Sequence, residues 1–354
     1  MYKKIIDYFL FIKRRLVIKK NFIECNNFLK SGIYKFSTCM KYIYINENDI
    51  GKKSYQLFHR NFTNKYIRFL RSIVYFILFS KPINVLNKTD KFQGQVYLPG
   101  NEGNKSLSKR AKIFDFINMK IVEIFDSEDE IERKITYYHY YFQYYNVPKI
   151  YEVNKEKMYL IEEFILDNKK ASDTKKILAA VLDKQINQID IKCLSLNNNI
   201  IEKLVYVNKK ISDLYCFDII ENMDYEIHEY NQLFVECIQH GDLWFGNIFM
   251  MNYGPIIIDY EHSGNYWFCY DFFTFLLHEY SKYNRFDCLD AYVMKEYDFY
   301  LDKIFCKLNT HYKPEGKADY FSIYVLYRNS VSMMSKNDLI KCFEVINYIK
   351  GKSV

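Results

Sequence analysis

The sequence predicts an α+β protein in which a small antiparallel sheet with one helix is followed by a mainly helical region. Residues 92–165 alternate strand-like and turn-like stretches around a single helical segment. Residues 268–350 carry apolar residues at helical spacing with few glycines or prolines. The 354 residues, 49% hydrophobic and 26% charged, suffice for two domains, or for one bilobal enzyme with an extension.

The sheet is expected from five strand-like segments, at residues 95–98, 111–116, 120–125, 147–153 and 158–165. A turn at 99–104 and a tight connection at 117–119 separate the first three segments. Ser127 and Glu130 have the spacing of a capping box. We therefore expect a helix that begins at this point and continues to about residue 145.

Further along the chain, the pattern changes to helical spacing. Residues 170–232 predict two or three helices, and residues 234–239 predict a short strand. Residues 248–251 and 255–259 predict a hairpin with its turn at Gly254.

The first 90 residues differ from the rest in charge. They hold 18 Lys and Arg against 5 Asp and Glu, a net charge of +13, whereas the whole chain carries +7. Residues 1–20 predict a basic amphipathic helix, which is typical either of a membrane-surface element or of a helix that packs on the rest of the protein. Residues 33–70 show no clean period, and residues 66–79 predict a further helix. We expect three parts: a basic extension at 1–90, a sheet lobe at 91–165 and a helical lobe at 166–354.

Several classes of protein are not expected. The charged cluster at residues 13–15 interrupts the first apolar stretch, so it does not resemble a signal peptide, and no apolar run approaches the roughly 20 residues of a membrane span. The nine cysteines include no CxxC pair, which predicts reduced thiols, no zinc site and a cytoplasmic location. The basic residues of the extension lie among Ile, Leu and Phe without a recognisable nucleic-acid motif, so no nucleic-acid partner is expected.

Polar residues with catalytic potential are concentrated in one segment. Asp242 and Asn247 lie in a loop that contains Gly241 and Gly246, and Asp259 follows an apolar strand 12 residues after Asn247. Phosphoryl transfer requires a carboxylate at the acceptor hydroxyl, together with a carboxylate and an amide oxygen that hold Mg²⁺. These three side chains are such a set.

The same segment resembles a known family. Residues from His240 to Asn247 read H-G-D-L-W-F-G-N, and Asp259 lies in I-D-Y-E. Both are similar to the motifs of the aminoglycoside phosphotransferase and choline kinase family. The resemblance implies a protein-kinase-like bilobal fold, with Asp242 as the catalytic base and Asn247 and Asp259 as magnesium ligands. It also implies that Asp271 stabilises the catalytic region, and His240 is expected to brace the loop by hydrogen bonding.

The nucleotide-binding residues of the sheet lobe are marked less clearly. Kinases of this type place a lysine on the third strand and pair it with a glutamate of the next helix. Here the third strand contains Lys120 and Glu123, which point to opposite faces because strand side chains alternate. Either Lys120 holds the nucleotide phosphates, or Glu123 pairs with Lys134 of the helix and the phosphates are held in another way.

Two further positions in this lobe are candidates for nucleotide contact. Gly100 and Gly103 lie in a turn that can cover phosphates through backbone amides, and a plain hairpin turn fits them equally well. Glu162 and Glu163 lie where the last strand leads into the hinge that contacts adenine in this family, or they are the charged exit of an ordinary core strand.

These observations together predict a phosphotransferase that uses ATP or GTP with Mg²⁺. Its acceptor is expected to be a hydroxyl of a small polar molecule or glycan, including a lipid-linked or cell-surface glycan precursor. The basic extension would then contact the anionic inner face of the membrane. The alternative is a pseudokinase that serves as a binding scaffold, an interpretation favoured by the ambiguous lysine and by the unusual first 90 residues.

Overall fold

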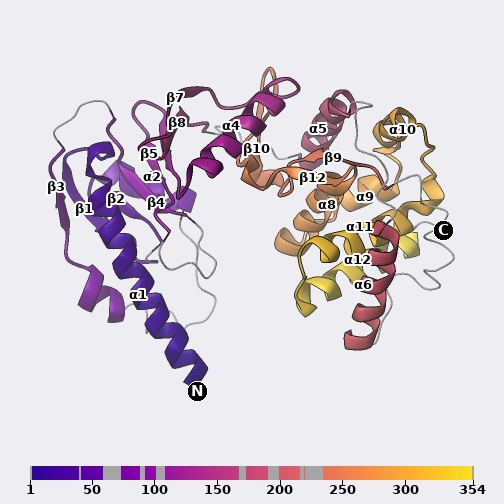
Figure 1. The fold of residues 1–354 in the computed structure, drawn as a ribbon, viewed down its shortest axis with the longest axis horizontal. Helices are drawn as coiled ribbons and strands as arrows, with labels where there is room; N and C mark the ends of the chain where they lie inside the picture. The colour runs from indigo at the N-terminus through magenta and orange to yellow at the C-terminus, as the bar shows by residue number, and fades with distance from the viewer. Residues whose placement is uncertain are drawn as a thin grey trace. The chain divides into compact units, whose positions relative to one another are not determined.

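A computed structural model describes residues 2–39, 41–58, 73–87, 92–100, 108–166, 173–189, 199–215, 219 and 234–352. The chain divides into two compact units. The first consists of Met1–Arg133 and Pro148–Leu166, and the second of Lys134–Val147 and Asp167–Val354. In Figure 1 the first unit contains the sheet, drawn in indigo to magenta, and the second is mostly helical and drawn mainly in orange to yellow.

The first unit is built on one antiparallel sheet of eight strands among the described residues, in the order β3-β1-β2-β4-β5-β6-β8-β7. Its strands are β1 Gly32–Phe36, β2 Ile43–Ile45, β3 Ile83–Val85, β4 Val96–Pro99, β5 Ala111–Asp115, β6 Lys120–Ile124, β7 Ile150–Asn154 and β8 Tyr159–Glu163. Strands β4 to β8 coincide with the five predicted segments to within a few residues. Helix α4, Glu128–Phe142, begins at the predicted capping box and ends three residues before the predicted end.

The first 90 residues form part of this sheet instead of a separate extension. Strands β1, β2 and β3 come from this region, and β2 pairs with β4 through Ile43 and Tyr97. Helix α1, Tyr2–Glu24, packs against the sheet, with the ring centroid of Phe22 5.2 Å from that of Tyr34 and 5.5 Å from that of Tyr97. The division expected at residue 90 therefore differs from the structure, because strands of three and five residues are too short to show a period in the sequence.

Other parts of this region agree with the prediction only in part. The helix expected at residues 1–20 is present as α1 (Figure 1). Helix α2, Asn48–Phe58, lies in the stretch without a clean period. Of the helix expected at 66–79, the described part contains the π-helical turn η2, Tyr75–Phe79, and residues 66–72 lie outside the described residues. The short 3-10 turn η1, Asn26–Phe28, links α1 to β1.

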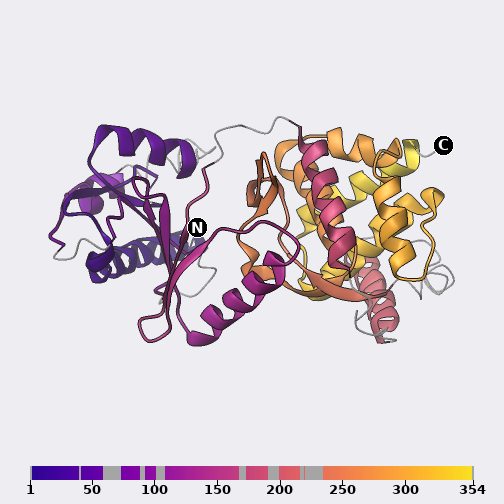
Figure 2. The ribbon, with the colours of Figure 1, turned by 90° about the horizontal axis from the view of Figure 1, so that it is seen from above.

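The second unit combines two small sheets with a group of helices (Figure 2). Its strands form the pairs β10–β11 and β9–β12, and the former is the predicted hairpin. Strand β12 was not predicted. The elements are α5 Thr174–Gln188, α6 Asn199–Tyr215, β9 Glu236–Gln239, η4 Phe245–Asn247, β10 Ile248–Met251, β11 Gly254–Ile257, η5 Tyr260–His262, β12 Gly264–Trp267, α8 Tyr270–Tyr283, α9 Asp287–Val293, α10 Asp298–Lys307, η6 Pro314–Gly316, α11 Lys317–Val331 and α12 Lys336–Lys352.

The core of the second unit surrounds α8. Residues 270–277 of this helix are all buried, and Phe273 stacks on Trp267 of β12 with ring centroids 5.7 Å apart. Burial of aromatic side chains of this size is a large stabilising contribution. Helix α8 is therefore a rigid support for the residues at its first turn.

Two other expectations concern the cysteines and membrane-spanning helices. The seven cysteines among the described residues are all free thiols, and five of the seven are buried. Within the same residues, no helix has the length and apolar character needed to cross a membrane.

Candidate active site

The loop after β9 is held by one buried carboxylate. Asp271, in the first turn of α8, accepts hydrogen bonds from the backbone N–H groups of His240 (2.5 Å) and Gly241 (2.9 Å). Burial raises the pKa of the Asp271 carboxyl above its ordinary value, and this effect outweighs the opposing effects of His240 and of the two N–H donors. Asp271 therefore fixes the start of the loop to the core helix.

His240 connects the loop to the strand end that carries Asp259. Its Nε2 lies 2.8 Å from the backbone carbonyl oxygen of Ile258, which can only accept, so Nε2 carries the proton. Nδ1 accepts from the backbone N–H of Asp242 at 3.3 Å. The neutral tautomer with a proton on Nε2 satisfies both contacts, which is the bracing geometry expected for His240.

Asn247 and Asp259 are brought together by the β10–β11 hairpin. The Nδ2 group of Asn247 donates to the backbone oxygen of Asp242 at 2.9 Å, and the backbone N–H of Ile258 donates to the backbone oxygen of Asn247 at 3.0 Å. Asp259 follows with a φ of 64°, a left-handed conformation that Asp tolerates better than most residues. The loop and the hairpin end thus form one hydrogen-bonded frame.

Asp242 lies in a mixed electrostatic environment. Its pKa is raised, chiefly by burial and also by the charge of Asp259, while His240, His262 and Arg328 act to lower it. A carboxyl with a raised pKa is a stronger proton acceptor than a solvated one once it is ionised. The structure therefore brings Asp242, Asn247 and Asp259 together, as the motif predicts.

Gly241 is required by the path of the loop. Its φ is +80°, and a Cβ atom built on it would lie 2.3 Å from the backbone oxygen of His262 and 2.9 Å from the ring of Tyr266. Only glycine adopts this conformation at no steric cost. The backbone of η5 therefore packs directly on the residue that precedes Asp242.

The chemistry of the donor set fits Mg²⁺. Asn247 offers an amide oxygen, because its nitrogen is committed to Asp242, and Asp259 offers a carboxylate. Mg²⁺ prefers hard oxygen ligands and completes its shell with water and substrate phosphates. No cluster of three or more His, Cys, Asp or Glu suited to a metal ion is found in the described part of the chain.

In the sheet unit, Glu123 occupies the buried position of β6, and Lys120 does not. Glu123 is 3% exposed and lies 3.8 Å from Lys112 and 4.0 Å from Arg110, measured from its carboxylate oxygen. The Lys120 ammonium instead lies 4.8 Å from the ring centroid of Tyr151. The alternation of side chains along β6 places the two residues on opposite faces, as the sequence predicts.

The other candidates for nucleotide contact in this unit lie in different surroundings. The N–H of Gly100 donates to Arg110, and Gly103 lies outside the described residues. Glu162 is buried on β8, whereas the Glu163 carboxylate accepts from the backbone N–H of Lys149 at 3.3 Å, which joins β8 to the chain before β7. The Glu163 contacts fit a hinge residue and an ordinary strand end equally well.

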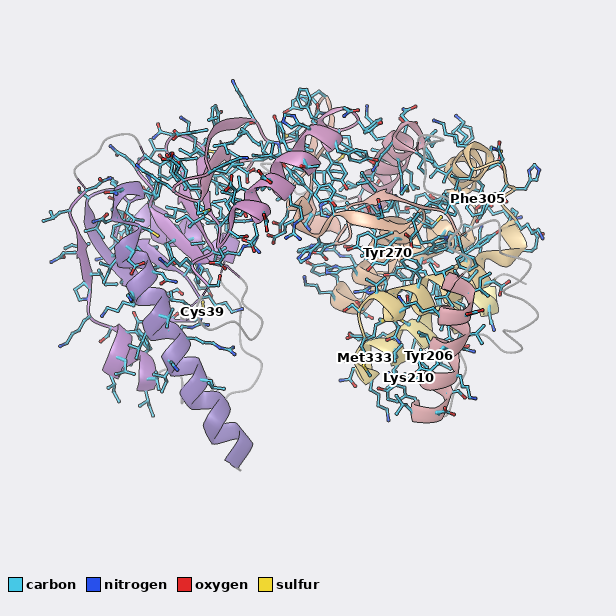
Figure 3. All side chains as sticks on the ribbon, in the orientation of Figure 1. Cys39, Tyr206, Lys210, Tyr270, Phe305 and Met333 are labelled. Carbon is cyan, nitrogen blue, oxygen red and sulfur yellow. The ribbon has the colours of Figure 1, made fainter. Side chains whose placement is uncertain are left out.

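Three functional candidates were missed by the sequence analysis. Arg110 and Lys112 could have been found from the tight 117–119 connection, because it pairs Lys112 with Glu123 across the two strands. Arg328, on α11, has no local signal. A groove of about 320 Å³ between α6 and the end of α11 is lined by Tyr206, Lys210 and Met333 among others (Figure 3) but by no motif residue.

Comparison with known proteins agrees with the motif. The model of the phosphotransferase enzyme family matches residues 215–296, the segment that holds the loop, the hairpin and Asp271. This match confirms, over these residues, the resemblance of the motif to a phosphotransferase family. No curated protein matches the chain.

Solved structures similar to this chain are distant in sequence. Amicoumacin kinase hAmiN in complex with AMP-PNP, Ca²⁺ and Ami is 13% identical, with 73% of this chain and 88% of that chain covered and a TM-score of 0.40. Choline kinase LicA from Streptococcus pneumoniae is 13% identical, with coverages of 71% and 92% and a TM-score of 0.35. A thermostable mutant of an aminoglycoside phosphotransferase, in a ternary complex with ADP and hygromycin B, is 10% identical, with coverages of 73% and 92% and a TM-score of 0.40.

Proposed function

We propose that the chain transfers the terminal phosphoryl group of ATP or GTP to a hydroxyl group, with Asp242 as the general base. The hydroxyl oxygen attacks the γ-phosphorus, the bond from the γ-phosphorus to the β–γ bridging oxygen breaks, and the hydroxyl proton passes to the Asp242 carboxylate. Asn247 and Asp259 would hold Mg²⁺, which neutralises phosphate charge when bound.

The observation that carries this proposal is the hydrogen-bonded frame around Asp242. Asp271 accepts hydrogen bonds from the backbone at the start of the loop, and the His240 ring bonds to the backbone of Ile258. The Asn247 side chain donates to the backbone oxygen of Asp242. Because transfer of a phosphoryl group depends mostly on positioning and electrostatics, a rigid frame is the main contribution that the protein can make. A scaffold without catalysis would not need this number of bonds on one short loop.

Within the sheet unit, we propose that Arg110 and Lys112, instead of Lys120, take the part of the phosphate-binding lysine that kinases of this type carry on the third strand. Both side chains lie within 4.0 Å of the buried Glu123 carboxylate, and Arg110 also lies 3.7 Å from Glu130 of α4. The strand carboxylate Glu123 thus stands where such kinases have the lysine, and the cations come from β5 and from the residue before it. Cations anchored in this way are suited to hold the nucleotide phosphates.

The proposal is tested by transfer from ATP or GTP, with Mg²⁺, to sugars, amino alcohols, aminoglycosides and glycolipid precursors. Asp242→Asn should lower transfer by about 10²- to 10⁴-fold and retain nucleotide binding, because only the proton acceptor is lost. Asp302→Asn, which makes the same change at an exposed position of α10, is the matched control. Absence of both transfer and magnesium-dependent nucleotide binding would favour the scaffold interpretation.

We further propose that the acceptor is a small polar molecule or a glycan, including a lipid-linked or cell-surface precursor reached at the inner face of the membrane. Support comes from the charge of residues 1–90 and from α1, which buries Ile18 and Phe22 and exposes Lys13 and Lys20. The full chain should sediment with anionic vesicles at low salt and not with neutral phosphatidylcholine vesicles. Equal sedimentation with both kinds of vesicle, or with neither, would contradict membrane contact.

A further inference from the structure

Arg328, a half-buried cation of α11, is among the groups that act to lower the pKa of Asp242. Arg328 donates a hydrogen bond to the Tyr324 hydroxyl at 2.8 Å. Among the described residues it has no carboxylate within ion-pair distance. A guanidinium that is partly removed from water without a counter-charge is costly unless a ligand supplies one. Arg328 is therefore suited to bind an anion.

A series of contacts places Arg328 on the same side of α8 as the catalytic loop. The Tyr324 hydroxyl that accepts from Arg328 shares a second hydrogen bond with Thr274 at 3.0 Å. One turn further along α8, the His278 ring lies 4.6 Å from the ring of Trp244, measured between centroids. Trp244 is two residues from Asp242 in the sequence, so these contacts connect Arg328 through α8 to the loop that carries Asp242.

More positive charge gathers at Trp244. The Lys282 ammonium lies 3.9 Å from the Trp244 ring centroid and 3.4 Å from Nε2 of His278. The pKa of His278 is lowered to about 4, first by burial and then by Lys282 and Arg328, which indicates a positive local potential. Trp244, two residues after Asp242 in the sequence, is only half-buried, so the part of its ring that Lys282 and His278 leave uncovered can contact the apolar face of a sugar ring.

The acidic groups in this region are engaged elsewhere. Glu279 pairs with Arg285 at 3.4 Å, and Glu236 accepts from the Tyr327 hydroxyl at 2.8 Å. Asp271 is bound to the loop backbone. Asp259 is a proposed magnesium ligand. The side of the loop next to Trp244 thus combines an aromatic ring with the cations Lys282 and Arg328.

We infer that the acceptor is an anionic sugar or polyol, whose phosphate, sulfate or carboxylate group binds Arg328 while its ring lies on Trp244 and its hydroxyl meets Asp242. This inference rests on the proposed function, since it names the substrate class of the same site. A guanidinium binds such groups in bidentate fashion, which fixes orientation as well as affinity. A cationic acceptor would be repelled by Arg328 and Lys282.

The test compares four matched acceptors with the full chain, Mg²⁺ and ATP: glucose, glucosamine, glucuronate and glucose 1-phosphate. The wild-type kcat/KM should be highest for one of the two anions and lowest for glucosamine. Arg328→Gln should lower the ratio of kcat/KM for the preferred anion to that for glucose by roughly 10- to 100-fold, and Arg328→Lys by less. Glucuronate and glucose 1-phosphate separate carboxylate from phosphate recognition.

Two further measurements keep the outcome interpretable. Lys282→Met is a second variant, at an exposed lysine that lies over the Trp244 ring. Lys303→Met is its control, because Lys303 is also exposed and its ammonium lies 4.0 Å from the centroid of an aromatic ring, that of Phe299 on α10. Inorganic phosphate is titrated against the tryptophan fluorescence, to which Trp244 and the buried Trp267 both contribute, with AMP-PNP and Mg²⁺ present. In the wild type it should quench this fluorescence, and Arg328→Gln should weaken the quench roughly 10-fold or more.

The outcomes separate this inference from the proposed function. Preference for glucose or glucosamine, or phosphate binding that does not depend on Arg328, would overturn the anionic acceptor while transfer itself still supported a kinase. Arg328-dependent phosphate binding without any ATP turnover, including turnover to water, would leave the anion site standing and refute the proposed function. If turnover to water is present and none of the four sugars is an acceptor, the phosphate titration decides.

Discussion

Asp271→Asn is the substitution that most directly tests the frame around the catalytic loop. The wild-type carboxylate accepts from two backbone N–H groups, those of His240 and Gly241, at 2.5 and 2.9 Å. Asparagine has one oxygen in place of two. One of the two buried N–H groups therefore loses its acceptor, and the other keeps a neutral acceptor in place of a charged one.

The magnitude follows from these two changes. An unsatisfied buried N–H costs about 1–3 kcal/mol, and the weaker remaining hydrogen bond costs about 1 kcal/mol more. Burial raises the pKa of Asp271, so a neutral side chain recovers part of a desolvation cost, which we set at about 1 kcal/mol. The net loss is about 1–3 kcal/mol, a fall in Tm of roughly 2–12 °C for a unit of about 200 residues.

The assay pairs thermal unfolding with transfer kinetics. Because the loop that carries Asp242 loses one of its attachments, we expect kcat/KM to fall by roughly 10- to 100-fold as well. Asp287→Asn, at the exposed first turn of α9, removes the same charge and should change stability by less than about 0.5 kcal/mol. An Asp271→Asn protein with the Tm and the transfer rate of the wild type would refute the reasoning.

Three other outcomes are expected. Gly241→Ala should lower the free energy of unfolding by about 2 kcal/mol or more and abolish most transfer, because φ is +80° and the new methyl would lie 2.3 Å from the His262 backbone oxygen. Gly351→Ala, where a new methyl would have no atom within 4 Å, is the control in thermal unfolding. Lys112→Met should raise KM for the nucleotide roughly 10-fold or more, and Lys120→Met should leave it nearly unchanged. A larger rise in KM for Lys120→Met than for Lys112→Met would identify Lys120 as the phosphate-binding residue. The pKa of His278 is about 4 in the folded protein and about 6.5 in the unfolded chain, so the neutral ring contributes stability above pH 6.5 that is lost as pH falls toward 4. Denaturant unfolding at pH 7.5 and pH 5 should therefore show a smaller loss of unfolding free energy between the two pH values for His278→Gln than for the wild type.

The parts of the fold that could be predicted are those with local signals. Strands β4 to β8 are bounded by turns, α4 begins at a capping box, and the β10–β11 hairpin turns at a glycine. The loop with Asp242 and Asn247 was predictable because all of its functional groups lie within 20 residues of sequence. Family resemblance adds to that signal and does not replace it.

The remainder depends on pairing between distant segments. Glu123 was recognised as a candidate, but its partners Arg110 and Lys112 follow from the register between β5 and β6. Arg328 reaches the catalytic loop through Tyr324 and Thr274, contacts between α11 and α8 that no motif encodes. Strands β1 to β3 were missed because three to five residues are too few to establish a period of two.

The pairing of β2 with β4 has a consequence for the integrity of the sheet unit. If the chain began near residue 91, β4 would become an edge strand whose N–H and C=O groups are unpaired, and Val96 and Tyr97, both 0% exposed, would lose their cover. Exposed apolar edges recruit other strands and lead to aggregation. The first 90 residues thus shield one edge of the sheet, whatever else their charge attracts, and truncation there should yield an insoluble protein instead of a smaller kinase.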